Sequence, residues 1–162
     1  MTSVSAAGHE HHERLETMLD TLPAFADMLD EQPRPARLEE RFRMIVRSMS
    51  GTLVPHIERV EETVYPELDR LMQSRHSMTL MRGEHDDIKG HVERLDTFGE
   101  VIKAAALGPA GTVGLRRVLY RLYALLKVHL AEEEEYLRVL EHNLSPDEQA
   151  ELVGRLEHAV AE

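Results

Sequence analysis

The chain has no cysteine and no tryptophan, and only 4% of its 162 residues are aromatic. The absence of cysteine excludes disulfide bonds, thiolate metal ligands and thiol-based catalysis. No apolar run approaches the roughly 20 residues that a membrane-spanning helix needs. Basic residues are scarce as well, because 19 Lys and Arg stand against 30 Asp and Glu, a formal charge of -11. Since nucleic-acid binding relies on clustered positive charge, we expect neither a nucleic-acid partner nor a membrane.

Leucine, alanine, glutamate and arginine are abundant, and these residues favour helix over strand. The length suits one domain with a substantial core, so we expect a single domain over 1–162, with 1–8 disordered. The N-terminal residues lack the pattern of a signal peptide, which predicts a cytoplasmic protein. Apolar positions recur with the helical period over four long stretches, at about 8–29, 36–72, 77–106 and 112–143.

Two prolines and one capping pattern refine the predicted bounds of these helices. Pro55 and Pro66 predict a kink or an early end within the second stretch. The spacing from Ser145 to Glu148, with Pro146 at the first helical position, predicts a short fifth helix that begins with a capping box.

Four histidines divide the chain symmetrically: His12, His56, His85 and His129. The midpoints of consecutive pairs fall at 34, about 70 and 107, on or near the breaks between the helical stretches. In antiparallel helices, equal distances up and down each hairpin bring all four imidazoles to one height. The sequence therefore predicts an all-α fold, an up-down-up-down antiparallel four-helix bundle with a short C-terminal fifth helix, and a metal site inside it.

The fourth helix carries the strongest local signal, because His129 and Glu133 are four residues apart on its apolar stripe. Burial of a carboxylate costs several kcal/mol unless a charged or hydrogen-bonding group compensates, which favours a ligand role. The alternative is a solvated acidic run, 132–135, beside a core histidine. Glu134 lies farther round the helix, but its side chain is long enough to reach back.

The other helices leave alternatives open. On the second helix Val60 follows His56 by one turn, and the nearest later acid, Glu61, lies on the flank of the stripe or on a surface face. On the first helix periodicity does not choose between His11 and His12. On the third, either His85 or His91 has only a packing or supporting role.

The types of candidate ligand residue narrow the choice of metal. Imidazole and carboxylate together suit iron, zinc or manganese. No Glu-x-x-His pair occurs, so the ferritin-type di-iron motif is missing, and no His-Glu-x-x-His occurs, which excludes a zincin-type protease. Glu84 is placed to orient an imidazole by accepting its second N–H. Tyr136 shares the face of His129 and is expected to be core rather than a hydrogen-bond donor to a bound ligand.

Three stretches together resemble the hemerythrin-like, or HHE cation-binding, domain: His56 with 61–66 (EETVYP), 84–88 (EHDDI) and 129–134 (HLAEEE). The resemblance runs from His11-His12 to the helix after Ser145. It implies an up-down bundle that holds two non-haem irons bridged by carboxylates. By this resemblance the metal ligands are His12, His56, His85 and His129, with Glu133 or Glu134 as the bridge and Glu61 as the candidate acid on the second helix.

Two positions depart from the family pattern. The bridging glutamate four residues after His56 is Val60 here, so that Glu61 substitutes for it or a bridge is lost. The histidine often found four residues before His85 is Met81. Both changes argue against stable reversible oxygen carriage, and they leave coordination positions open to peroxide, nitric oxide or solvent.

We therefore expect an iron protein that binds, senses or reacts with O2, NO or peroxide. Two iron ions are expected, with one as the alternative, and zinc or manganese are less favoured. A different interpretation is a regulatory or metal-delivery bundle that acts through a protein partner and carries a single or structural metal. A third interpretation, an enzyme with substantial peroxide turnover, requires an activity assay.

Overall fold

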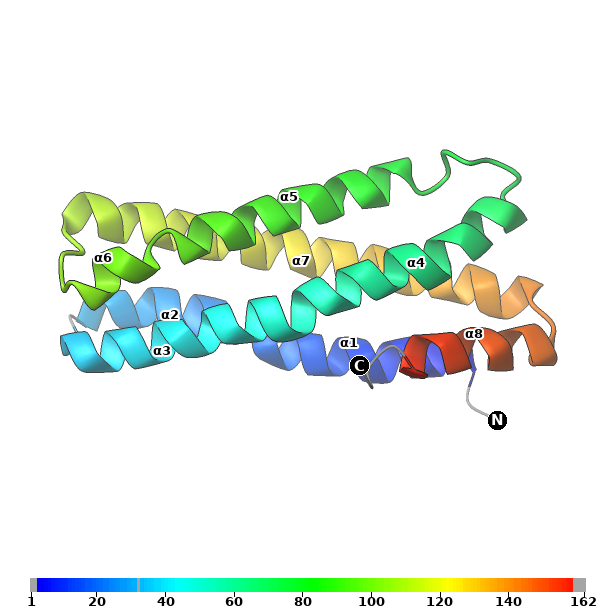
Figure 1. The fold of residues 1–162 in the computed structure, drawn as a ribbon, viewed down its shortest axis with the longest axis horizontal. Coiled ribbons are helices and arrows are strands. Elements are labelled where there is room, and N and C mark those ends of the chain that lie inside the picture. Colours follow the sequence, from blue (N-terminus) through cyan, green and yellow to red (C-terminus); the bar gives the residue numbers. More distant parts are fainter. Residues whose placement is uncertain (1–2, 32, 159–162) are drawn as a thin grey trace.

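The computed structural model describes residues 3–31 and 33–158, and in this part of the chain every regular element is a helix. Successive long helices alternate in direction, and α8 packs beside α1 and α4 (Figure 1). The structure thus confirms the predicted all-α bundle with a short C-terminal helix. The elements are α1 (Val4–Leu19), α2 (Thr21–Met28), the 3-10 turn η1 (Leu29–Glu31), α3 (Pro35–Ser48), the π-helical segment η2 (Met49–Leu53), α4 (Val54–Leu71), α5 (Thr79–Asp96), α6 (Gly99–Lys103), α7 (Pro109–Asn143) and α8 (Pro146–His158).

The first helix begins earlier than the sequence suggested. Ser3 is its N-cap, and the Ser3 hydroxyl accepts a hydrogen bond from the Ala6 amide at 3.2 Å. Val4 is fully buried in an apolar cluster, which stabilises this first turn. Residues 4–8 therefore belong to α1 and are not the disordered segment that was expected, while 1–2 lie outside the described residues.

The second predicted helix, 36–72, is α3, η2 and α4 in one column. Pro55 has no N–H to donate, and just before it the Val54 amide donates to the carbonyl of Met49, five residues back rather than four. This wide π turn is the local distortion that Pro55 predicted. Pro66, by contrast, lies inside α4 without ending it. The π segment directly precedes His56, in keeping with the frequent occurrence of such turns at functional sites.

The remaining helices follow the expected order with shifted ends. The third stretch is divided into α5 and the single-turn α6, and α7 begins at Pro109 rather than at 112. At the start of α8 the Ser145 hydroxyl accepts from the Glu148 amide, and the Glu148 carboxylate accepts from the Ser145 amide. The predicted capping box is therefore confirmed.

The apolar core consists of two clusters. The first lies toward α2, α3 and α6 and includes Leu22, Phe42 and Leu119, while the second lies toward α8 and includes Leu68 and Leu140. The buried histidines and Glu133 lie at or next to the boundary between the two clusters along each long helix. This arrangement places the site in the middle of the bundle rather than at one end. None of the helices in 3–31 and 33–158 combines the length and the apolar character that a membrane crossing needs.

Candidate metal centre

Five polar side chains from all four columns of the bundle meet in its interior: His12 of α1, His56 of α4, His85 of α5, and His129 and Glu133 of α7. Each has an exposed fraction of at most 4%. The four histidines that the spacing singled out therefore do face inward. A polar layer this well buried needs internal partners, because burial removes most of its contact with water.

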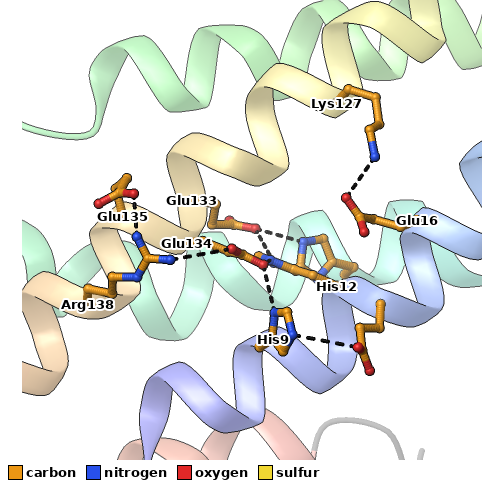
Figure 2. Close-up of polar contacts among 10 residues, drawn as sticks. His9, His12, Glu16, Lys127, Glu133, Glu134, Glu135 and Arg138 are labelled. Atoms are coloured by element: carbon orange, nitrogen blue, oxygen red, sulfur yellow. Dashed lines mark hydrogen bonds and ion pairs between the residues drawn. The ribbon is translucent and has the colours of Figure 1, made fainter.

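Glu133 stands at the centre of this layer. Its Oε2 accepts hydrogen bonds from Nε2 of His12 at 2.9 Å and Nε2 of His56 at 3.1 Å. Figure 2 shows the Glu133 carboxylate extending from α7 toward His12 on α1. Burial alone would raise the pKa of Glu133, but the two imidazoles outweigh it and hold that pKa well below its usual range. Glu133 is thus an anion in the bundle interior, with an exposed fraction of only 1%.

The imidazoles of His85 and His129 are oriented by acids on neighbouring helices. The Nδ1–H of His85 donates to Glu61 at 2.7 Å, and the Nδ1–H of His129 donates to Glu84 at 2.8 Å. The contact expected of Glu84 is therefore present. In each ring this bond leaves Nε2 as the nitrogen with a lone pair directed inward. Burial, aided by the neighbouring His129, lowers the pKa of His85 to about 4, so this imidazole is neutral at physiological pH.

The potential ligand atoms form two groups within the part of the chain that the structure describes. One group is His12, His56 and Glu133, and the other is His85, His129 and Glu133, with the ligand atoms of each group within 4.8 Å of one another. Glu133 belongs to both groups. One carboxylate between two pairs of imidazoles is an arrangement that could hold a bridged pair of ions inside a four-helix bundle.

The residues fit such ions. Nε2 of His129 is buried and has no hydrogen-bond partner, although its Nδ1 is engaged. An orphaned imidazole nitrogen of this kind is costly unless an ion takes its lone pair. The donors are nitrogen and oxygen with no sulfur, a set that suits iron, zinc or manganese.

Two acids predicted as ligands lie outside both groups. Glu61 accepts from His85 at 2.7 Å, as described above. The Glu134 carboxylate accepts from Nδ1 of His9 at 3.1 Å and lies 3.6 Å from Nδ1 of His12 (Figure 2). In this structure both acids support imidazoles from outside, because their positions on the flanks of α4 and α7 direct them away from the central space.

The structure also distinguishes the alternative histidines. His12 and His85 enter the groups, whereas His91 is half-buried and donates to the carbonyl of Asp87 at 2.8 Å. His11 stacks on His56, with ring centroids 4.7 Å apart. Burial, followed by the neighbouring His56 and His12, lowers the pKa of His11 to about 4. His11 is therefore a neutral neighbour of the first group rather than a member of it.

Tyr65 is a site residue that sequence reasoning missed. Tyr65 is fully buried, and its hydroxyl donates to Oε1 of Glu133 at 3.4 Å. The Tyr65 hydroxyl oxygen also lies 3.2 Å from Nε2 of His85. Burial, followed by the charge of Glu133, raises the pKa of Tyr65. The available signal was its position one turn after Glu61 on the same helix face. Tyr136, which was considered instead, is half-buried against the second apolar cluster.

Comparison with known protein families agrees with this geometry. The model of the hemerythrin HHE cation binding domain matches residues 6–140. The chain belongs to this family. No curated protein and no solved structure matches the chain significantly. Members of the hemerythrin HHE family bind metal, generally iron, which makes metal binding the function that the matched domain implies. Helix α8 lies beyond the matched residues.

This hemerythrin domain has a cavity of about 180 Å³ beside the first group of ligand atoms. Val60, Val64 and Leu137 supply apolar wall, and Arg14 and Arg59 supply positive charge. Val60, which stands where the family pattern has a bridging glutamate, therefore leaves space next to His12 and His56 instead of a carboxylate. Met81, the other departure, is buried in the second apolar cluster.

Proposed function

We propose that this hemerythrin domain holds two iron ions, one in each group of ligand atoms, and that the pair binds or reacts with O2, NO or peroxide. The proposal is carried by one observation, the participation of Glu133 in both groups. A carboxylate has two oxygens, so Glu133 can give one to each ion. The ligands would be His12 and His56 for one ion and His85 and His129 for the other.

Iron is favoured by the family and by the donor set of imidazole and carboxylate. When bound, a pair of iron ions supplies open coordination positions and a change of oxidation state, which are what small oxidising molecules require. The protein's own part is to hold the imidazoles correctly turned. Glu61 and Glu84 do this for His85 and His129, because an accepted Nδ1–H leaves Nε2 free to ligate.

Access for a small molecule is provided by the cavity beside His12, His56 and Glu133. Its wall is apolar at Val60, Val64 and Leu137, and its volume of about 180 Å³ accommodates a diatomic molecule or peroxide with room to spare. The opposite group is enclosed by Tyr65 and the second apolar cluster. We therefore assign the approach of the small molecule to the His12 side. The cytoplasmic location stays a prediction.

The test is elemental analysis of the purified protein combined with absorption spectra before and after addition of azide, peroxide or dithionite. We expect iron at two ions per chain, as the two groups require, and a spectrum that responds to these reagents. Glu133→Ala should lose both ions, whereas Glu135→Ala, an exposed acid two residues away, should keep them. Full iron content in Glu133→Ala would overturn the shared-ligand assignment.

The same measurements distinguish the alternative function. A single colourless metal such as zinc, with no response to azide or dithionite, would favour a structural metal in a bundle that acts through a protein partner. Iron without a response to any of the three small molecules would likewise contradict the proposed reactivity.

A further inference from the structure

The Tyr65 hydroxyl occupies a position that the proposed pair of ions leaves unexplained. The side chain projects from α4 into the interior with an exposed fraction of 0%. Its oxygen lies 3.2 Å from Nε2 of His85 and 3.4 Å from Oε1 of Glu133. Both of these residues belong to the second group of ligand atoms. The phenol oxygen is therefore adjacent to the second group and not to the bundle surface.

The two distances are those expected between atoms that bind one ion. Nitrogen and oxygen ligands lie about 2.0–2.2 Å from a metal, so two neighbouring ligands of one ion are about 3 Å apart. Tyr65 satisfies this spacing toward an imidazole nitrogen and a carboxylate oxygen at the same time. Nε2 of His129, buried and without a hydrogen-bond partner, completes the surroundings of that position.

An ion in the second group would also take the present partners of the hydroxyl. Nε2 of His85 would turn its lone pair to the metal, and the Glu133 carboxylate would ligate as well. A buried hydroxyl oxygen is costly when it loses its partners. A bond from the hydroxyl oxygen to the ion would replace these partners.

Without an ion the surroundings of Tyr65 disfavour an anionic oxygen, because burial and the nearby Glu133 raise the pKa of Tyr65, so only a bound cation would make the phenolate favourable. The guanidinium of Arg82 lies 5.2 Å from the centroid of the Tyr65 ring. Met81, one turn before His85, is buried in the second apolar cluster and offers only a thioether, a soft donor that iron does not favour beside imidazole and carboxylate. The second group therefore offers two imidazoles and one shared carboxylate, and His85 is its only member from α5 (79–96).

We propose that the Tyr65 phenolate oxygen is a ligand of the ion held by His85 and His129. This inference rests on the proposed function, since it requires an ion in the second group. On binding, the O–H bond of the phenol breaks, its proton leaves to solvent, and the oxygen lone pair forms the bond to the metal. No electron is transferred in this step.

The experiment is spectroscopy of the full chain loaded with iron and oxidised in air to the ferric state. A phenolate bound to ferric iron gives a visible charge-transfer band, and resonance Raman excitation in that band enhances tyrosinate ring vibrations. We expect both signals in the wild type and their loss in Tyr65→Phe, which retains most of the iron. Tyr136→Phe is the matched control, because Tyr136 is half-buried and packs against the second apolar cluster; it should keep iron and signals alike.

Each outcome decides a different statement. Iron in the wild type without tyrosinate vibrations, or vibrations that persist in Tyr65→Phe, would overturn the ligand role and leave the di-iron proposal standing. A wild type that binds no iron would overturn the proposed function instead. Should Tyr65→Phe fail to fold, the wild-type spectrum still decides, because Tyr65 is the fully buried tyrosine beside the ligand atoms, whereas the other three are half-buried or exposed: Tyr120, Tyr123 and Tyr136.

Discussion

At the scale of single residues, His129 offers the most direct test of a ligand. One ring nitrogen donates to Glu84, while the other is buried without a partner. His129→Ala should cost about half of the bound iron or more, since a ligand of the second ion is removed and metal binding is tied to a complete site. His91→Ala is the control, because His91 is half-buried and bonds only to a backbone carbonyl in this structure. Unchanged iron in His129→Ala, measured by elemental analysis, would contradict the assignment.

Glu84 is predicted to tune the metal without touching it. Glu84→Ala removes the acceptor that orients His129, and the loss of such a supporting carboxylate typically lowers metal affinity about 10- to 100-fold. Competition with a coloured chelator measures this change. Glu93→Ala, an exposed acid on the same helix, should leave the affinity unchanged. Equal affinities in the two variants would show that His129 needs no orienting partner.

Substitutions at Val60 distinguish the effect of an added carboxylate ligand on iron binding from the effect of filling the cavity. Val60→Glu places a carboxylate at the cavity beside His12 and His56, so iron should bind more tightly and the spectral response to azide should weaken. Without metal the same variant should be less stable, because a charge is then buried unpaired. Val60→Leu fills space without charge and should leave iron affinity unchanged. Iron binding that is no tighter in Val60→Glu would mean that Glu133 already supplies all the carboxylate the site uses.

At the scale of helices, the sequence predicted the level of the histidines along the bundle better than the direction in which the flanking acids point. The common level of His12, His56, His85 and His129 follows from helix lengths, which the positions of proline and glycine reveal. The target of a flanking acid depends on the rotation and tilt of each helix and on the π turn before His56. Glu61 was therefore correctly placed near the site, but its contact with Nδ1 of His85 could not be derived from periodicity.

Helix α8 is held to α4 by charge as well as by apolar contact. Glu67 of α4 accepts from Arg70 at 2.9 Å and from Arg155 of α8 at 3.1 Å. The hydrogen bond from Arg70, with the contribution of Arg155, lowers the pKa of Glu67. A carboxyl whose folded-state pKa lies below its unfolded value stabilises the fold above that unfolded value and loses this contribution as the pH falls.

The corresponding prediction concerns Glu67→Gln. At neutral pH this variant should be less stable than the wild type by about 0.2–1 kcal/mol, the size of a partly exposed ion pair. The difference should fade as the pH falls below 4.5, the ordinary pKa of glutamate. Thermal unfolding at a series of pH values measures it, with Glu151→Gln, an exposed acid of α8, as the control. A difference that grows on acidification would refute the role of this ion pair.

At the scale of the whole molecule, the bundle keeps a buried polar layer near the boundary between two apolar clusters. The class of fold, the order of the helices and the convergence of the four histidines were predicted correctly because they depend on patterns spread over many residues. Tyr65 was missed because a single tyrosine in an apolar stripe looks like core, and only the partners of its hydroxyl reveal otherwise. Its importance lies in contacts that cross from α4 to α5 and α7, which local sequence does not encode.

Removal of the metal should lower the stability of the whole bundle. Without ions the buried histidines and Glu133 lose the cations that they bind. A metal present at 100 times its Kd stabilises a fold by about 2.7 kcal/mol. A strong chelator should therefore reduce the melting temperature of the wild type. Glu133→Ala, which already lacks the shared ligand, should melt at the same temperature with and without chelator. A wild type that is insensitive to chelator would show that the metal contributes nothing to folding.

The central claim is that two ions lie on either side of Glu133, and anomalous X-ray scattering from crystals of the iron-loaded protein tests it most directly. The account predicts two iron peaks, one beside His12 and His56 and one beside His85 and His129, each in contact with the Glu133 carboxylate. A single peak, a peak elsewhere in the bundle, or imidazoles turned away from the metal would contradict it.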